Sequence, residues 1–293
     1  MTFHRDLAWA ASFVLLWSTG FVGIRYGAPF APPFIFIAIR MAIAAALLVI
    51  IVIALQGRFT LTLRQIAQTA VTGLLLHGAY LGGCFYAVSR GVPAGIVALI
   101  VSTQPILVAC AGTLFLGEKL DRRVLIGLIL GACGVALVLA PRITTHSAAH
   151  LSGAGIAACL IAALGGASGT MAQKRFAQQD HPLESAMYQY IATGIATYAL
   201  SLLLGEGPVT WSPTFVAALA WLVLALSLGA ILILFSLLKK GSASSVSSLY
   251  YLVPPTTAVM SFFLFGEPIT VVLIIGMAIT ISGVYLVIKK PAN

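Results

Sequence analysis

The chain has 293 residues, of which 60% are hydrophobic and 8% are charged, whereas about a quarter of the residues of an ordinary soluble domain are charged. This composition excludes a soluble globular protein and indicates one that lies within a lipid bilayer. The formal net charge of +9 does not indicate a nucleic-acid partner, because the basic residues are dispersed in ones, twos and threes at the ends of apolar runs.

Apolar runs of about 20 residues, each long enough to cross a hydrocarbon core as a helix, follow one another from Leu7 to Ile288. Ten such runs can be counted, and their continuous rather than alternating hydrophobicity excludes a membrane β-barrel. No small-residue cleavage motif follows the first run, so we expect it to be retained rather than removed as a signal peptide. The predicted fold class is an all-α polytopic membrane protein with ten transmembrane helices.

The first and third runs carry polar and aromatic residues that are expected to face protein or water rather than lipid. Trp17 lies in a small, polar cluster of the first run, and His77 and Tyr80 share one face of the third. We assign this face to the interior of the bundle. A single histidine in a span can also form a hydrogen bond to the backbone of a neighbouring helix. His77 therefore has two alternative roles, a packing role and a role in lining the transport pathway.

Arg40 stands inside the second run, within its first two turns. A long basic side chain this close to a helix end usually extends to the membrane interface, and this is the interpretation that we favour. The alternative is that Arg40 binds a carboxylate or a phosphate.

An internal repeat relates the two halves of the chain. At a constant spacing of 149 residues, Ala94 falls on Ala243, Pro105 on Pro254 and Gly117 on Gly266. Coincident Ala, Val and Leu residues mean little in apolar sequence, but the coincident proline and the Gly-Glu pairs that end at Glu118 and Glu267 indicate an old duplication. We predict a first five-helix repeat at residues 1–141, a linker at 142–151 and a second repeat at 152–293.

Prolines interrupt the fourth and ninth runs near the bilayer midplane. Pro105, Pro254 and Pro255 each remove an amide donor and are expected to free the carbonyls of Val101, Tyr250 and Tyr251, respectively. Interrupted helices at equal depth in two repeats are typical of a transporter's binding site. A structural kink is the alternative, and it is less favoured because the interruption occurs in both halves.

The candidate substrate site consists of neutral polar and aromatic residues near this depth. They are Trp17, His77, Tyr80, Ser102, Gln104, Thr170, Ser244, Ser248 and Tyr251. Such a lining, without a fixed counter-charge, suits a zwitterion better than a bare cation. The four cysteines stand singly in different runs, so we expect no metal site, no disulfide framework and no cofactor.

Basic residues also predict the orientation. With the N-terminus inside, the cytoplasmic segments carry twelve Lys and Arg residues and the opposite side carries three, which predicts that both termini are cytoplasmic. Because each repeat has an odd number of spans, the second must be inserted upside down relative to the first.

The sequence resembles the ten-helix EamA branch of the drug/metabolite transporter superfamily along nearly its whole length. The resemblance is carried by LLWSTGFV in the first run, by FIAIRMAIAA around Arg40, by GCFYAVSRGVPAGIVALIVSTQPILVACAGTLFLGEKL and by FSLLKKGSASSVSSLYYLVPPTTAVMSFFLFGEPI. Within that branch, its size and sequence resemble those of bacterial amino-acid exporters. The resemblance implies a basket of ten helices around a central cavity in the bacterial inner membrane, and export of hydrophobic or aromatic neutral amino acids. The sequence leaves the oligomeric state open, with a monomer as one alternative.

Other functions are less compatible with the sequence. It has no His-Glu-x-x-His, Gly-x-Ser-x-Gly or phosphate-loop motif, which argues against an enzyme. A channel would leave the inverted duplication unexplained. The remaining rival is efflux of cationic drugs or other small metabolites, which commonly uses an acidic residue within the membrane, whereas Glu118 and Glu267 stand at the ends of runs.

Overall fold

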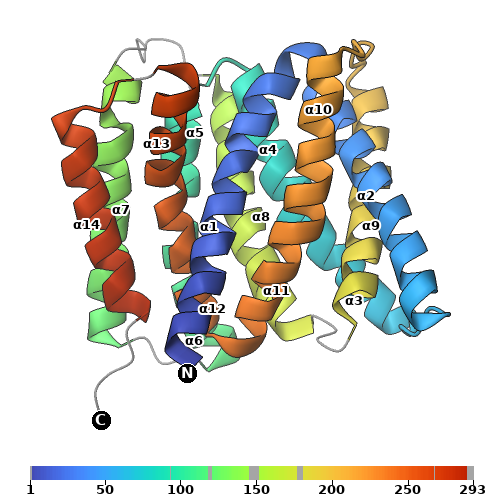
Figure 1. Cartoon of the computed structure of the whole chain (residues 1–293), viewed down its shortest axis with the longest axis horizontal. Coiled ribbons are helices and arrows are strands. Elements are labelled where there is room, and N and C mark those ends of the chain that lie inside the picture. Colours follow the sequence, from blue (N-terminus) through green and yellow to red (C-terminus); the bar gives the residue numbers. More distant parts are fainter. Residues whose placement is uncertain are drawn as a thin grey trace.

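The computed structural model describes residues 2–92, 94–117, 121–144, 152–176, 181–266 and 268–288, and all regular secondary structure in these residues is helical. The helices stand side by side across one slab, and α1 (Thr2–Gly27) begins on the same face at which α14 (Val271–Ile288) ends (Figure 1). Within the described residues, nine helical segments are long and apolar enough to cross a membrane. The protein is therefore a multi-pass membrane protein.

Between these two helices the chain forms a series of α-helices with short 3-10 and π-helical segments. In chain order they are η1 (Ala28–Phe30), α2 (Pro33–Gln56), α3 (Leu63–Gly73), η2 (Leu74–Ala79), α4 (Tyr80–Ser89), α5 (Ala94–Val101), α6 (Gln104–Leu116), α7 (Arg122–Thr144), α8 (Gly153–Phe176), α9 (Pro182–Leu203), α10 (Pro213–Trp221), η4 (Leu222–Ala230), α11 (Ile231–Lys240), α12 (Ala243–Ser248), η5 (Leu249–Leu252) and α13 (Val253–Phe265).

Helix α9 is the predicted span that is not among these nine segments. It has 22 residues, which is enough to cross the bilayer, but one of its faces is polar. That buried stripe consists of Ser185, Gln189, Thr193, Thr197 and Ser201, spaced four residues apart so that they share a face. The helix lies between α2 and α3, and the stripe lowers its hydropathy without exposing polar groups to lipid.

The spacing of 149 residues relates whole helices of the two halves as well as single identical residues. Pro33 begins α2, and its counterpart Pro182 begins α9. Helix α6 corresponds residue for residue to α13, and both end at a glycine in the left-handed region, with φ of 65° at Gly117 and 67° at Gly266. The π-helical segment η2 falls within the π-helical segment η4.

Helices α7 and α14 approach so closely that their backbones touch. A Cβ atom on Gly127 would lie 2.7 Å from the carbonyl oxygen of Gly283, and one on Gly134 would lie 2.8 Å from that of Gly276. Small residues at such a crossing allow close van der Waals packing in lipid. Gly127 corresponds to Gly276 and Gly134 to Gly283 at the spacing of 149 residues. Replacing each glycine by its counterpart therefore turns one of these two contacts into the other.

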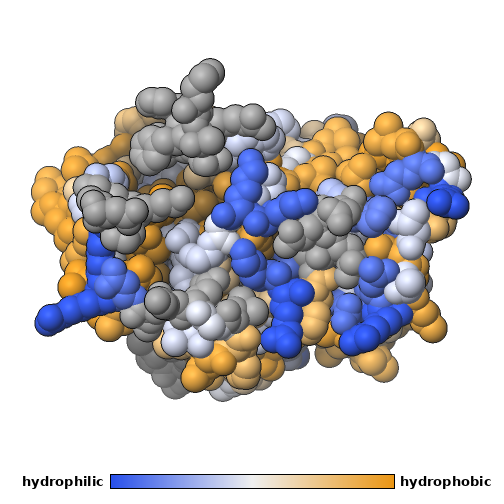
Figure 2. All heavy atoms as spheres, turned by 90° about the horizontal axis from the view of Figure 1, so that it is seen from below, coloured by the Kyte–Doolittle hydropathy of each residue, from blue (hydrophilic) through white to orange (hydrophobic). Residues whose placement is uncertain are grey.

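Hydrophilic side chains gather on the face where α1 begins, and apolar side chains surround them (Figure 2). Several described helices place basic residues at this face: α7 starts with Arg122 and Arg123, α8 ends near Lys174 and Arg175, and α11 ends with Lys239 and Lys240.

Two carboxylates form hydrogen bonds to backbone amides near the two ends of α2. Glu206 accepts hydrogen bonds from the amides of Phe34 and Ile35 at 3.0 and 2.7 Å, which satisfies free donors at the start of α2. Beyond the other end of α2, Glu184 of α9 accepts from the amides of Thr60 and Leu61, at 2.9 and 3.0 Å. Both carboxylates bind backbone amides rather than basic side chains.

Candidate functional site

The helices are interrupted at both predicted positions. Helix α5 ends at Val101, and α6 starts three residues later at Gln104, with Pro105 in its first turn, where a missing amide donor costs no helical hydrogen bond. In the second half, η5 separates α12 from α13, whose first turn contains Pro254 and Pro255.

The carbonyl of Tyr250 is not left free by this break. It accepts a hydrogen bond from the amide of Val253, because η5 is wound as a 3-10 helix with bonds between residues three apart. The expectation that Pro254 frees this carbonyl is therefore wrong.

An aromatic cluster lies where α1 crosses the break between η5 and α13. The Trp17 ring lies 5.1 Å from that of Phe13 and 5.4 Å from that of Tyr250, measured between centroids. Tyr80, only 8% exposed, lies beside both Trp17 and Tyr250. The structure thus brings together two residues of the predicted site, Trp17 and Tyr80, with Tyr250, which sequence reasoning missed. We call Phe13, Trp17, Tyr80 and Tyr250 the aromatic cluster.

Tyr251, which the sequence placed in the site, lies apart from this cluster. Its side chain is fully buried and packs against Gly131 of α7, near Cys133. Tyr250 and Tyr251 thus point in different directions from the same 3-10 turn, and the sequence carries no signal that selects between two adjacent tyrosines.

The neutral polar residues of the predicted site fall into two groups. Gln104 of α6 donates to the Thr170 hydroxyl of α8 at 3.4 Å, and both side chains are buried. The hydroxyls of Ser102 and Ser248 instead bond to backbone carbonyls one turn earlier, at 2.6 and 2.8 Å, which satisfies them locally. Ser244 is also buried, in α12.

A further polar group surrounds His77 in η2. The His77 ring lies 5.2 Å from the ring of Tyr190 in α9, whose hydroxyl donates to the backbone carbonyl of Ser227 at 2.5 Å. Arg40 reaches the same place, and its Nε donates to the Ser227 hydroxyl at 3.0 Å. Arg40 is only 8% exposed. The interpretation that its side chain extends to the membrane interface is therefore wrong: it lies inside the bundle. We call Arg40, His77, Tyr190 and Ser227 the Arg40 group.

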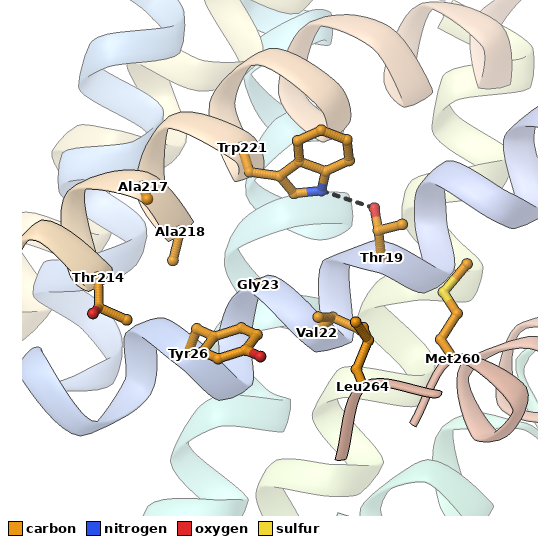
Figure 3. A pocket seen from close by; sticks show the side chains of 10 residues that line it. All are labelled: Thr19, Val22, Gly23, Tyr26, Thr214, Ala217, Ala218, Trp221, Met260 and Leu264. Atoms are coloured by element: carbon orange, nitrogen blue, oxygen red, sulfur yellow. Dashed lines mark hydrogen bonds between the residues drawn. The ribbon is translucent and has the colours of Figure 1, made fainter. Parts of the chain in front are cut away.

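A described groove lies elsewhere in the bundle. It has a volume of about 550 Å³ and runs between α1, α10 and α13, where Trp221 donates to Thr19 at 3.0 Å (Figure 3). Its lining includes exposed apolar side chains such as Leu264, and it lies on the side of α1 away from α4 and α8. None of the predicted site residues lines it, so we place the candidate site at the aromatic cluster and its polar neighbours.

The described part of the bundle interior holds no acidic side chain and no cluster of residues that could ligate a metal ion. Glu184 is buried, but it lies in the first turn of α9 and binds the loop at Thr60. Glu118 and Glu267 lie outside the described residues. Within the described residues, Arg40 is accordingly the one ionised side chain that is buried inside the bundle.

Comparison with known proteins identifies the family. A model of the EamA-like transporter family matches residues 5–140 and again residues 153–289. A crystal structure that is 20% identical, and that covers 97% of this chain and 96% of its own, superposes with a TM-score of 0.81 and so shares the fold.

Three relatives illustrate the range of similar proteins. The uncharacterized transporter YvbV of Bacillus subtilis is 29% identical, covering 96% of this chain and 90% of that protein. The uncharacterized inner membrane transporter YedA of Escherichia coli K12 is 27% identical, covering 93% and 87%. A probable amino-acid metabolite efflux pump of Salmonella typhimurium is 25% identical, covering 97% and 94%. Since the family model matches both halves of a chain that spans the membrane repeatedly, the chain belongs to the EamA-like transporter family of the drug/metabolite transporter superfamily and is a membrane transporter of small metabolites.

Proposed function

We propose that this protein exports hydrophobic and aromatic neutral amino acids by alternating access. The observation that carries the proposal is the aromatic cluster, which lies at the helix break of one repeat and beside polar side chains without a described carboxylate. Aromatic faces bind an apolar side chain, and neutral polar groups suit the net neutrality of an amino-acid zwitterion.

Alternating access is supported by the correspondence between the two halves. Matching helix starts at Pro33 and Pro182, matching breaks at Pro105 and Pro254, and the exchanged glycine contacts of α7 and α14 are what a two-fold axis in the membrane plane would produce. In this arrangement ten helices form two inverted five-helix repeats around a central site, which rocking of the repeats opens to either side. Pro105, Pro254 and Pro255 then mark the segments that move.

The direction of transport and the membrane orientation follow from charge and from similarity. Described basic residues gather on the face where α1 begins, which we assign to the cytoplasm, together with both termini. One relative is named as a probable amino-acid metabolite efflux pump, and another as an inner membrane transporter. We assign export across an inner membrane on this basis.

Uptake into proteoliposomes tests the function. We expect radiolabelled phenylalanine and leucine to enter with saturation, and Trp17→Ala or Tyr80→Ala to reduce the uptake while the amount of reconstituted protein stays the same. Tyr198→Ala, on an exposed face of α9, is the matched control. Failure of every amino acid in a panel, together with saturable flux of a quaternary ammonium dye, would replace this proposal with cationic drug efflux.

A further inference from the structure

Arg40 is a buried cation with neutral neighbours. Its side chain is 8% exposed, its Nε donates to a serine hydroxyl, and the groups close to it include Tyr190 and His77. An ionised side chain inside a membrane bundle is costly unless it has an opposite charge nearby, and residues of this kind usually mark a ligand or ion pathway.

The chain does not offer Arg40 an obvious partner of its own. Its seven acidic residues all lie at or beyond the ends of the predicted spans: Asp6, Glu118, Asp121, Asp180, Glu184, Glu206 and Glu267. Among the described ones, Glu184 and Glu206 bind backbone amides of loops and helix starts, and Asp121 accepts from the amide of Arg123. An anion that neutralises Arg40 is therefore expected to come from outside the chain.

The Arg40 group and the aromatic cluster are neighbours. His77 and Tyr80 are three residues apart on one continuous span, with His77 in the π-helical segment η2 and Tyr80 at the first position of α4. His77 packs against Tyr190 beside Arg40, whereas Tyr80 packs beside Trp17 and Tyr250. Nearby positions of one span thus belong to the two groups.

The His77 side chain also has unused capacity for hydrogen bonding. Its Nε2 atom is buried and makes no hydrogen bond of normal geometry among the described residues, although the Gln189 side chain lies close to the ring, and an unsatisfied buried polar atom costs free energy. A carboxylate oxygen close to both Arg40 and His77 would accept from this nitrogen when it carries the proton.

From this arrangement we infer that Arg40 binds the carboxylate of the transported amino acid and thereby makes the protein specific for substrates with a free carboxylate. The inference rests on the proposed amino-acid transport. His77 lies between the carboxylate and the aromatic cluster, which receives the apolar side chain.

Competition with labelled phenylalanine in proteoliposomes tests the inference. The competitors are unlabelled L-phenylalanine and L-phenylalaninamide, which keeps the ring and the amine but lacks the carboxylate. We expect the wild type to prefer phenylalanine by about 10- to 100-fold, the range of a hydrogen bond to a charged group. Arg40→Gln is expected to abolish this preference because it weakens the binding of phenylalanine and leaves that of the amide unchanged. Arg40→Lys is expected to keep part of the preference.

Arg25→Gln is the matched control, because it removes an exposed arginine that lies over the Phe265 ring, outside the Arg40 group. We expect it to retain the wild-type preference for phenylalanine over the amide. If it loses the preference as Arg40→Gln does, the preference depends on the overall positive charge of the protein and the inference fails.

The remaining outcomes are also decisive. A wild type that takes up phenylalanine but binds the amide equally well overturns the carboxylate site and leaves amino-acid transport standing, even if no Arg40 variant folds. If Arg40→Gln weakens the binding of phenylalanine and of the amide equally, the carboxylate site is likewise overturned and amino-acid transport still stands. A wild type without saturable uptake of any amino acid overturns the proposed function and this inference together.

Discussion

Tyr250 and Tyr251 are adjacent in sequence and have different surroundings. Tyr250 faces Trp17 and Phe13, and Tyr251 is buried against α7. In an α-helix successive side chains differ by about 100° in direction, and a 3-10 turn changes this to about 120°. The choice between the two tyrosines therefore depends on where η5 begins, which is a feature of the packed structure.

Alanine substitutions at these two positions should have different effects. Tyr250→Ala is expected to raise the KM for phenylalanine about tenfold, because it removes an aromatic contact with the ligand and with Trp17. Tyr251→Ala is expected to lower the free energy of unfolding by about 3 kcal/mol, because it leaves a cavity against α7. Uptake kinetics and thermal unfolding in detergent measure the two effects. If Tyr251→Ala changed KM and Tyr250→Ala only stability, our assignment of the cluster would be reversed.

At the scale of elements, hydropathy and proline positions predicted most of what the structure contains. The multi-pass helical architecture is confirmed, and the break at Pro105 is where the sequence places it. The π-helical segments η2 and η4 were not predicted, because a single extra residue in a helical turn leaves the apolar pattern nearly unchanged. The burial of Arg40 was missed because depth along a helix does not tell which side of it faces the bundle.

The crossing of α7 and α14 should be sensitive to a single methyl group. A Cβ atom on Gly134 would lie 2.5 Å from the amide of Thr280 and 2.8 Å from the carbonyl of Gly276, so Gly134→Ala forces the two backbones apart. We expect it to lower the melting temperature in detergent by several degrees, as a loss of about 1–3 kcal/mol does in a protein of this size.

Gly78→Ala is the matched control, since an added Cβ atom there meets its nearest neighbour at 4.0 Å. It should leave the melting temperature unchanged or raise it slightly, because alanine loses less conformational entropy in a helix than glycine does. An equal effect of the two substitutions would mean that the close approach of α7 and α14 contributes nothing particular to stability.

The helix breaks lead to a prediction about the rate of transport. Pro105 lies in the first turn of α6, where its ring is tolerated and where alanine would allow α5 and α6 to join into one helix. We expect Pro105→Ala to insert and fold but to slow the exchange between inward- and outward-open forms, so that maximal uptake falls severalfold while KM changes little. Uptake at the wild-type rate would identify the proline as a packing feature.

At the scale of the whole molecule, the orientation can be tested by labelling. We expect Lys239→Cys, at the end of α11, to react with an impermeant maleimide only from the cytoplasmic side, and Gly207→Cys, in the exposed loop between α9 and α10, only from outside. Both are compared in a chain without its native cysteines. Reaction of Lys239→Cys from outside would invalidate the assignment of the basic face to the cytoplasm.

The engagement of Glu184 and Glu206 with backbone amides has a consequence for energetics. Proton-coupled carriers commonly use an acidic side chain within the membrane. Glu184 and Glu206 are instead held at the two ends of α2 by backbone amides, and no acidic residue of the sequence stands in the middle of a predicted span. We therefore expect the concentration gradient of the amino acid alone to drive transport, so that a pH difference across the liposome membrane does not cause accumulation. Accumulation that collapses when a protonophore is added would show instead that the protein uses the proton-motive force.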